Sequence, residues 1–180
     1  KGMYVNEVVE FWYAQYPWVG PGEDQVVDLL LERVGQLVED KGHLLPGAVR
    51  ALDLAGERGP MALASSTPLA LIYRCLDHFG LRERFVSVNS AQFEVFGKPH
   101  PAVFLTAAAS LDVRAPECLV IEDSAAGVLA AKAARMSVVA VPAIEDRDLA
   151  PFALADLVLT SLEELSGAWL DAQFASALAR

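Results

Sequence analysis

The sequence predicts an α/β protein with a mainly parallel sheet between two layers of helices. Over residues 44–180, short apolar segments alternate with segments of helical periodicity. The short segments are apolar on both faces, which is typical of buried parallel strands. The chain has 180 residues, 54% of them hydrophobic, so it is long enough to bury a core. Such a pattern favours a three-layer fold.

Residues 1–43 show helical periodicity only. Apolar side chains from Val5 to Trp12 fit one face of a first helix. A cluster of Pro and Gly over residues 17–22 interrupts the pattern, and a stripe of Val and Leu over residues 26–38 then predicts a long amphipathic helix. We expect this stripe to form the core of a separate helical unit.

The rest of the chain predicts five strands and four connecting helices. The strands are expected at residues 61–64, 85–88, 118–121, 138–141 and 157–159, and the helices at 48–58, 69–79, 99–111 and 124–135. Ligands of such folds bind beyond the carboxyl ends of the strands, so the residues that follow each strand are the candidates for function.

Composition excludes several classes of protein. The 24 acidic residues outnumber the 14 basic ones, which gives a net charge of −10 and argues against a nucleic-acid partner. No apolar run approaches the roughly 20 residues that cross a bilayer, and no secretory signal is recognisable. Two cysteines are too few for a disulfide framework. We therefore expect a cytoplasmic protein without a membrane partner.

Hydroxyl side chains follow the first predicted strand. Ser65, Ser66 and Thr67 precede a helix, where hydroxyls and free backbone amides form a natural phosphate cradle. The alternative is that one of these residues simply caps the helix.

A lysine follows the second predicted strand. Lys98 stands just before the helix expected from Pro99, although the positive end of a helix dipole disfavours a cation. An anion between Lys98 and the helix would explain the arrangement, and a solvated loop lysine is the alternative. His100, between two prolines, is expected only to cap or pack.

Two adjacent carboxylates follow the third predicted strand. Glu122 and Asp123 would repel each other unless a cation lay between them, and oxygen ligands of this kind suit Mg²⁺. The alternative is an Asp that caps the next helix beside a solvent-facing Glu. Taken together, the hydroxyl, lysine and carboxylate positions predict a phosphoryl-transfer site without its nucleophile.

In this order the motifs resemble those of the haloacid dehalogenase superfamily. The matching segments are 11–18, Leu44-Leu45-Pro46-Gly47, 62–66, Gly97-Lys98-Pro99-His100-Pro101, 121–124 and 131–136. The similarity is to the branch with a helical cap, which includes phosphatases of 2-deoxyglucose 6-phosphate and hexitol phosphates, and β-phosphoglucomutases. It implies that residues 1–43 are the remainder of a cap and that residues 44–180 form a Rossmann-like core.

The resemblance also implies roles for the candidate residues. Ser65 and Lys98 would act on the transferring phosphoryl group, with Ser66 as a further phosphate contact, and Glu122 and Asp123 would hold Mg²⁺. The implied substrate is a small phosphorylated sugar, attacked by an aspartate so that an aspartyl-phosphate forms.

That aspartate belongs to a first motif, Asp-x-Asp, at the end of a strand that precedes the cap. We expect the motif to be absent from the chain, so the core would lack its first strand and Lys1 would be an artificial beginning. Two alternatives to a phosphatase remain open. A phosphohexomutase needs a cation in the cap for a second phosphate, and the candidates are Lys1, Arg33 and Lys41. A catalytically inactive module could instead bind a phosphorylated ligand or a partner protein.

Overall fold

The computed structural model describes residues 4–178, with side chains to residue 175. Helices and strands alternate along most of the chain, which confirms the α/β class. The helices are α1 (Val5–Gln15), α2 (Glu23–Lys41), α3 (Ala48–Gly56), α4 (Leu69–His78), α5 (Ala102–Ser110), α6 (Ala125–Ala133) and α7 (Gly167–Leu178). The strands are β1 (Ala62–Ser65), β2 (Ser87–Ser90), β3 (Leu119–Glu122), β4 (Ser137–Ala140) and β5 (Leu157–Val158).

The strands form two parallel sheets, whereas the sequence predicts one. β1 pairs with β2 in the register Ala62↔Ser87, and β3 pairs with β4, which pairs with β5. A cavity of about 800 Å³ separates the two sheets, and the apolar residues of β1 and β3 line its walls. The free edges of β1 and β3, which would have to pair to make one sheet, therefore face this cavity.

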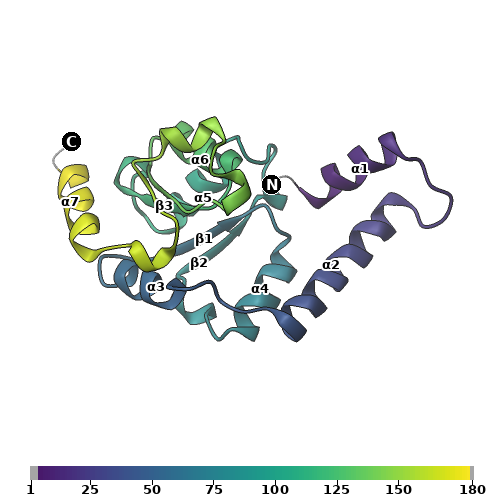
Figure 1. Cartoon of the computed structure of the whole chain (residues 1–180), viewed down its shortest axis with the longest axis horizontal. Helices are drawn as coiled ribbons and strands as arrows, with labels where there is room; N and C mark the ends of the chain where they lie inside the picture. Colours follow the sequence, from purple (N-terminus) through teal and green to yellow (C-terminus); the bar gives the residue numbers. More distant parts are fainter. Residues whose placement is uncertain (1–3, 179–180) are drawn as a thin grey trace.

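Two hydrophobic clusters give the core its three layers. On β4, Val138 and Ala140 pack with residues of α5 and α6 on one side of the sheet. Val139 points the other way, into a second cluster with Ala51 of α3 and Leu170 of α7. Figure 1 shows α5 and α6 on one side of β1 and β2, with α3 and α4 on the other.

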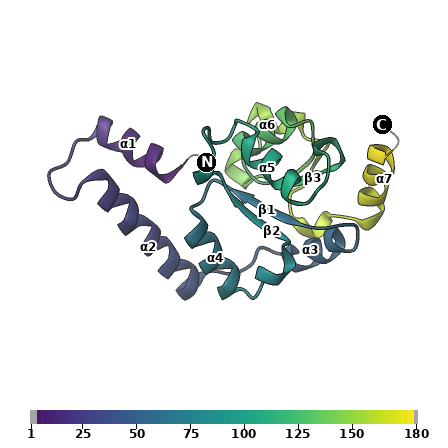
Figure 2. The same cartoon turned by 180° about the vertical axis from the view of Figure 1, so that it is seen from behind.

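Helices α1 and α2 form a hairpin that extends to one side of the strands (Figure 1, and from behind in Figure 2). The Nε1 of Trp18 donates to the Pro21 carbonyl at 2.9 Å in the turn between them. The expected core stripe of α2 is largely unburied: Val27 is buried, but Leu30 is 41% exposed and Val34 is 44% exposed. The boundary at residue 43 stays a prediction.

One arginine joins α2 to the rest of the molecule. The guanidinium of Arg74, on α4, donates to both oxygens of Glu39 at 2.6 and 2.7 Å and to Glu32 at 2.9 Å. It lies directly over Gly35, where a Cβ atom would come within 2.4 Å of its Nη1. The glycine thus permits the close approach of α2 to α4.

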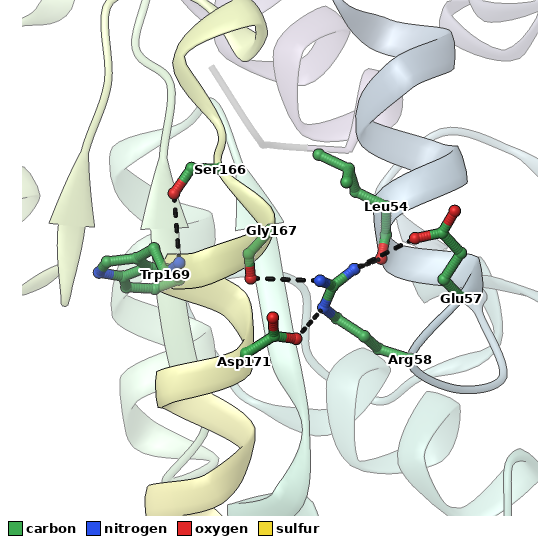
Figure 3. A network of polar contacts seen from close by, with 7 residues as sticks. All are labelled: Leu54, Glu57, Arg58, Ser166, Gly167, Trp169 and Asp171. Atoms are coloured by element: carbon green, nitrogen blue, oxygen red, sulfur yellow. Dashed lines mark hydrogen bonds and ion pairs between the residues drawn. The ribbon is translucent and has the colours of Figure 1, made fainter.

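A second arginine joins α3 to α7 (Figure 3). Arg58 donates to the carboxylate of Asp171 at 2.8 Å, to the Leu54 carbonyl at 2.6 Å and to the Gly167 carbonyl at 3.2 Å. Ser166 accepts from the Trp169 amide at 3.2 Å and so caps the first turn of α7. Within residues 4–178, no helix combines the length and apolarity required to cross a membrane.

Candidate active site

Ser65 ends β1 and closes the turn that follows it. Its Oγ accepts from the Thr67 amide at 3.1 Å, and α4 begins only at Leu69, with Pro68 as the N-cap residue. The side chain of Gln92, which follows β2, accepts from the Leu69 amide at 2.8 Å. Ser65 therefore does not cap α4. Its hydroxyl accepts a hydrogen bond within the turn but donates none there.

Lys98 is buried, so it is not a solvated loop lysine. Its side chain is 6% exposed, its Nζ lies 2.9 Å from Oε2 of Glu122, and it stands 4.6 Å from the ring centre of Phe104. The anion expected beside this lysine is thus a carboxylate of the protein itself. Phe104 adds a cation–π contact that the sequence pattern did not reveal.

The helix after Lys98 begins later than predicted. α5 starts at Ala102 rather than at Pro99, and Pro101 is its N-cap residue. The residue before a proline is restricted to extended backbone, so His100 cannot continue a helix into Pro101. As expected, His100 caps: its Nδ1 accepts from the Ala102 amide at 3.3 Å.

Glu122 points inward and both of its oxygens have partners. Oε2 faces Lys98, and Oε1 accepts from the Ser124 hydroxyl at 2.6 Å and the Ser124 amide at 3.2 Å. The N-cap of α6 is the buried Ser124, whose Oγ accepts from the Gly127 amide at 3.0 Å. The alternative of a capping Asp beside a solvent-facing Glu is therefore wrong.

Asp123 lies beside this pair with an exposed side chain. Partial desolvation and the charge of Glu122 raise the pKa of Asp123, while Lys98 acts in the opposite direction. A carboxylate whose ionisation is opposed by a neighbouring carboxylate fits a divalent cation, which would offset the repulsion.

The described residues offer few protein ligands for a cation at this position. Asp123 would be the main ligand, with Glu122 able to offer a remaining lone pair of Oε2. Among residues 4–178 no group of three or more His, Cys, Asp or Glu side chains is placed to hold a metal ion. The remaining ligands would be water, a substrate phosphate or another acidic residue, a pattern that Mg²⁺ accepts.

The structure brings together three of the five predicted site residues. Lys98, Glu122 and Asp123 lie within mutual electrostatic range at the carboxyl end of β3. Ser65 and Ser66 lie at the carboxyl end of β1, on the opposite side of the cavity, whose walls include Ala64 and Glu122. The serines and the carboxylates thus follow strands of different sheets, and Lys98, which follows β2, contacts Glu122 at the end of β3.

The expectation that the chain holds no Asp-x-Asp is wrong for the bare triplet. One such triplet is present, formed by Asp146, Arg147 and Asp148. It lies in the connection between β4 and β5, where a short 3₁₀ turn ends at Asp146. The Nη2 of Arg147 donates to the Thr160 carbonyl at 3.2 Å, so this segment packs toward the end of β5. The triplet does not occupy the position of the implied first motif.

A parallel α/β architecture with carboxylates and a lysine at the strand ends defines the class of α/β proteins whose ligands bind at that edge of the sheet. Comparison with known proteins is more specific. The profile of the haloacid dehalogenase-like hydrolases matches residues 5–135. Hexitol phosphatase B of Escherichia coli is 42% identical over 166 residues, which are 92% of this chain and 75% of that protein.

Two solved structures have the same fold. β-Phosphoglucomutase from Clostridium difficile superposes with a TM-score of 0.81 and 25% identity, over 99% of this chain and 80% of that one. CbbY from Rhodobacter sphaeroides, in complex with xylulose-(1,5)bisphosphate, gives a TM-score of 0.81 and 26% identity, over 92% and 76% of the two chains. The chain belongs to the haloacid dehalogenase-like hydrolase family and is an enzyme of that class.

Proposed function

We propose that the chain carries most of a Mg²⁺-dependent phosphatase that hydrolyses a small sugar-phosphate monoester, such as 2-deoxyglucose 6-phosphate or a hexitol phosphate. The observation that carries the proposal is the buried Lys98–Glu122 pair beside Asp123. A buried ion pair is costly to maintain and adds little stability by itself, so its position at a strand end favours a role in chemistry. The 42% identity to hexitol phosphatase B supports the sugar-phosphate substrate.

The side chains divide the work of phosphoryl transfer. Lys98 offsets negative charge on the transferring group, and its own position is held by Glu122 and Phe104. Ser65 donates its free hydroxyl hydrogen to a phosphoryl oxygen, and Ser66 is a further contact from the same turn. Asp123 and Glu122 would hold Mg²⁺, which supplies charge stabilisation when bound. Positioning and electrostatics of this kind are most of what the reaction requires.

The nucleophile is proposed to lie on a strand between β1 and β3. Both strands present apolar residues to the cavity, and both run parallel to their partners in the same sense. A parallel strand in that position would end between Ser65 and Glu122. An aspartate there would attack phosphorus and form the aspartyl-phosphate as the ester P–O bond breaks and the sugar leaves as its protonated alcohol; water then hydrolyses the acyl phosphate, which releases inorganic phosphate and restores the aspartate.

A phosphohexomutase is the second candidate, favoured by the likeness to β-phosphoglucomutase. A mutase needs a cation for the second phosphate of its bisphosphate intermediate. Of the three candidates, Lys1 lies outside the described residues, while Arg33 and Lys41 are both exposed on α2. Neither is placed at the strand ends by a contact with the site, which favours hydrolysis.

The test is phosphate release from a panel of hexose 6-phosphates and hexitol phosphates, with and without Mg²⁺. The chain is assayed alone and with an apolar synthetic peptide that ends in Asp-x-Asp. We expect Asp123→Ala to abolish Mg²⁺-dependent release without loss of the folded far-UV circular dichroism signal, while Asp28→Ala on the exposed face of α2 has no effect.

Each outcome has a distinct meaning. Release that survives Asp123→Ala would show that the metal is placed wrongly. Conversion of a hexose phosphate to its isomer, without free phosphate, would indicate the mutase. Binding of phosphorylated sugar without turnover under every condition would indicate the inactive module.

A further inference from the structure

The first turn of α6 contains a glycine whose missing side chain leaves room for Glu122. A Cβ atom at Gly127 would lie 2.0 Å from Cδ of Glu122, 2.1 Å from its Oε1 and 2.5 Å from its Cγ. These distances are far below any van der Waals contact. Gly127 is buried and has an ordinary helical backbone, so a turn or a positive φ does not explain the glycine.

Ser124 completes the same arrangement from the N-cap position. Its hydroxyl accepts from the Gly127 amide at 3.0 Å and donates to Oε1 of Glu122 at 2.6 Å. Its amide adds a second hydrogen bond to the same oxygen at 3.2 Å. Oε1 is therefore fully engaged by α6, which turns Oε2 toward Lys98 at 2.9 Å.

We propose that Gly127 and Ser124 are positioning residues that fix the Glu122 carboxylate and, through it, the ammonium group of Lys98. Gly127 leaves the volume that Glu122 fills, and Ser124 holds one carboxylate oxygen so that the other faces the lysine. The role assigned to Lys98 rests on the proposed function, but the geometry of the pair can be tested without it.

The experiment reads the Lys98 ammonium group directly. The sequence contains four lysines, Lys1, Lys41, Lys98 and Lys132, and a buried, hydrogen-bonded ammonium group exchanges its protons slowly enough to give a ¹⁵Nζ correlation signal. The Lys98→Met variant assigns the signal by its loss. We expect Gly127→Ala and Ser124→Ala to lose the Lys98 signal while the backbone amide spectrum of the folded chain remains.

The matched control is another helical glycine. At Gly56, in α3, an added Cβ atom meets Cε of Met61 at 3.4 Å and its Sδ at 4.0 Å, which are ordinary contacts. Gly56→Ala should therefore leave the Lys98 signal unchanged. Retention of that signal in Gly127→Ala would overturn the proposal.

A double-mutant cycle separates positioning from general helix packing. In the Glu122→Ala background the clash partner is gone, so Gly127→Ala should cause no further fall in Tm, although it lowers Tm in the wild-type chain. An equal fall in both backgrounds would show a merely structural glycine and overturn the proposal. If Glu122→Ala does not fold, the effect of Gly127→Ala on Tm is measured in the Lys98→Met/Glu122→Ala background. That background removes both charges of the buried pair, so neither is left without a partner.

Activity provides the last arm. If the wild-type chain releases phosphate under the conditions above, Gly127→Ala should reduce kcat at least tenfold and Gly56→Ala should not. If no variant or wild-type preparation shows turnover, the proposed function fails, while the ammonium signal and the double-mutant cycle still decide the role of Gly127.

Discussion

At the scale of single residues, Asp156 joins three elements through one oxygen. Its Oδ2 accepts from Lys132 of α6 at 2.8 Å and from the Val138 amide of β4 at 2.7 Å, just ahead of β5. Burial acts to raise the pKa of Asp156, but the hydrogen bonds from Lys132 and Val138 outweigh it, so the pKa is lowered. The ionised form is therefore the one that stabilises the fold.

The sign of this shift gives a pH prediction. Because the folded-state pKa lies below the unfolded value of about 3.9, the stabilisation is complete above that value and is lost as the pH falls through the folded-state pKa. Asp156→Asn should lower the free energy of unfolding by about 1 kcal/mol at pH 7, with a difference that shrinks toward pH 3. Urea unfolding across this range measures it.

The partner supplies the control. Lys132→Met removes the same ion pair from the other side, so its loss of stability should shrink in the same acidic range. A loss that is constant from pH 7 to pH 3 in either variant would contradict the assignment to the carboxylate.

The residue types at the candidate site could be predicted, but their partners could not. Ser65, Lys98, Glu122 and Asp123 stand out because they follow apolar strands. That Lys98 faces Glu122, and that Ser124 rather than Asp123 caps α6, depends on contacts across 24 residues of chain and on side-chain rotation. Periodicity carries no information on either.

At the scale of elements, α7 is fastened to α3 by Arg58 (Figure 3). Arg58→Met keeps the aliphatic stem but removes all three hydrogen bonds, while Leu170 and Phe174 still pack against the core. We expect amide hydrogen exchange in α7 to accelerate about tenfold, since hydrogen bonds from a charged group contribute about 1.5–3 kcal/mol. Exchange in β3 and β4 should not change.

Arg82→Met is the control variant for the hydrogen exchange of α7. Arg82 pairs with Asp77 and lies over the ring of Tyr73, on and next to α4, away from α7. Equal acceleration of α7 in both variants would mean that Arg58 has no particular role in docking that helix.

Helix positions were more predictable than helix starts. The stretch around α2 was recognisable because its apolar residues recur at helical spacing. The predicted start at Pro99 was wrong because a second proline, Pro101, excludes the helix until Ala102. The exposure of Leu30 and Val34 on α2 could not be predicted either, since periodicity marks an apolar face without showing what covers it.

At the scale of the whole molecule, the cavity between β1 and β3 is lined largely by apolar side chains. Its apolar walls and unpaired strand edges should bind the dye ANS. An apolar peptide that ends in Asp-x-Asp should displace ANS and raise Tm. The same peptide with a central proline should do neither, because proline has no backbone N–H to donate and so prevents the peptide from pairing as a strand.

Fluorescence titration and thermal unfolding measure these effects. A rise in Tm with both peptides would indicate non-specific association with the apolar walls. The separation of the sheets itself could not be foreseen, because each strand is apolar and flanked by turn residues whether or not it has a neighbour on both sides. Strand pairing depends on which segments lie side by side in the folded chain, and the apolar pattern of a single strand does not show this.

The division into two sheets also divides the candidate site residues between two lengths of chain. β1–β2 and β3–β5 are each continuous in sequence, and the turn between α5 and β3 carries the exposed Asp112 at a φ of 55° and the exposed Arg114. A cut in this turn would break no strand pairing and would leave Ser65 and Lys98 on one fragment, with Glu122 and Asp123 on the other. We expect the two fragments to associate through the hydrophobic clusters that they share, and the Lys98–Glu122 pair would exist only while they are associated.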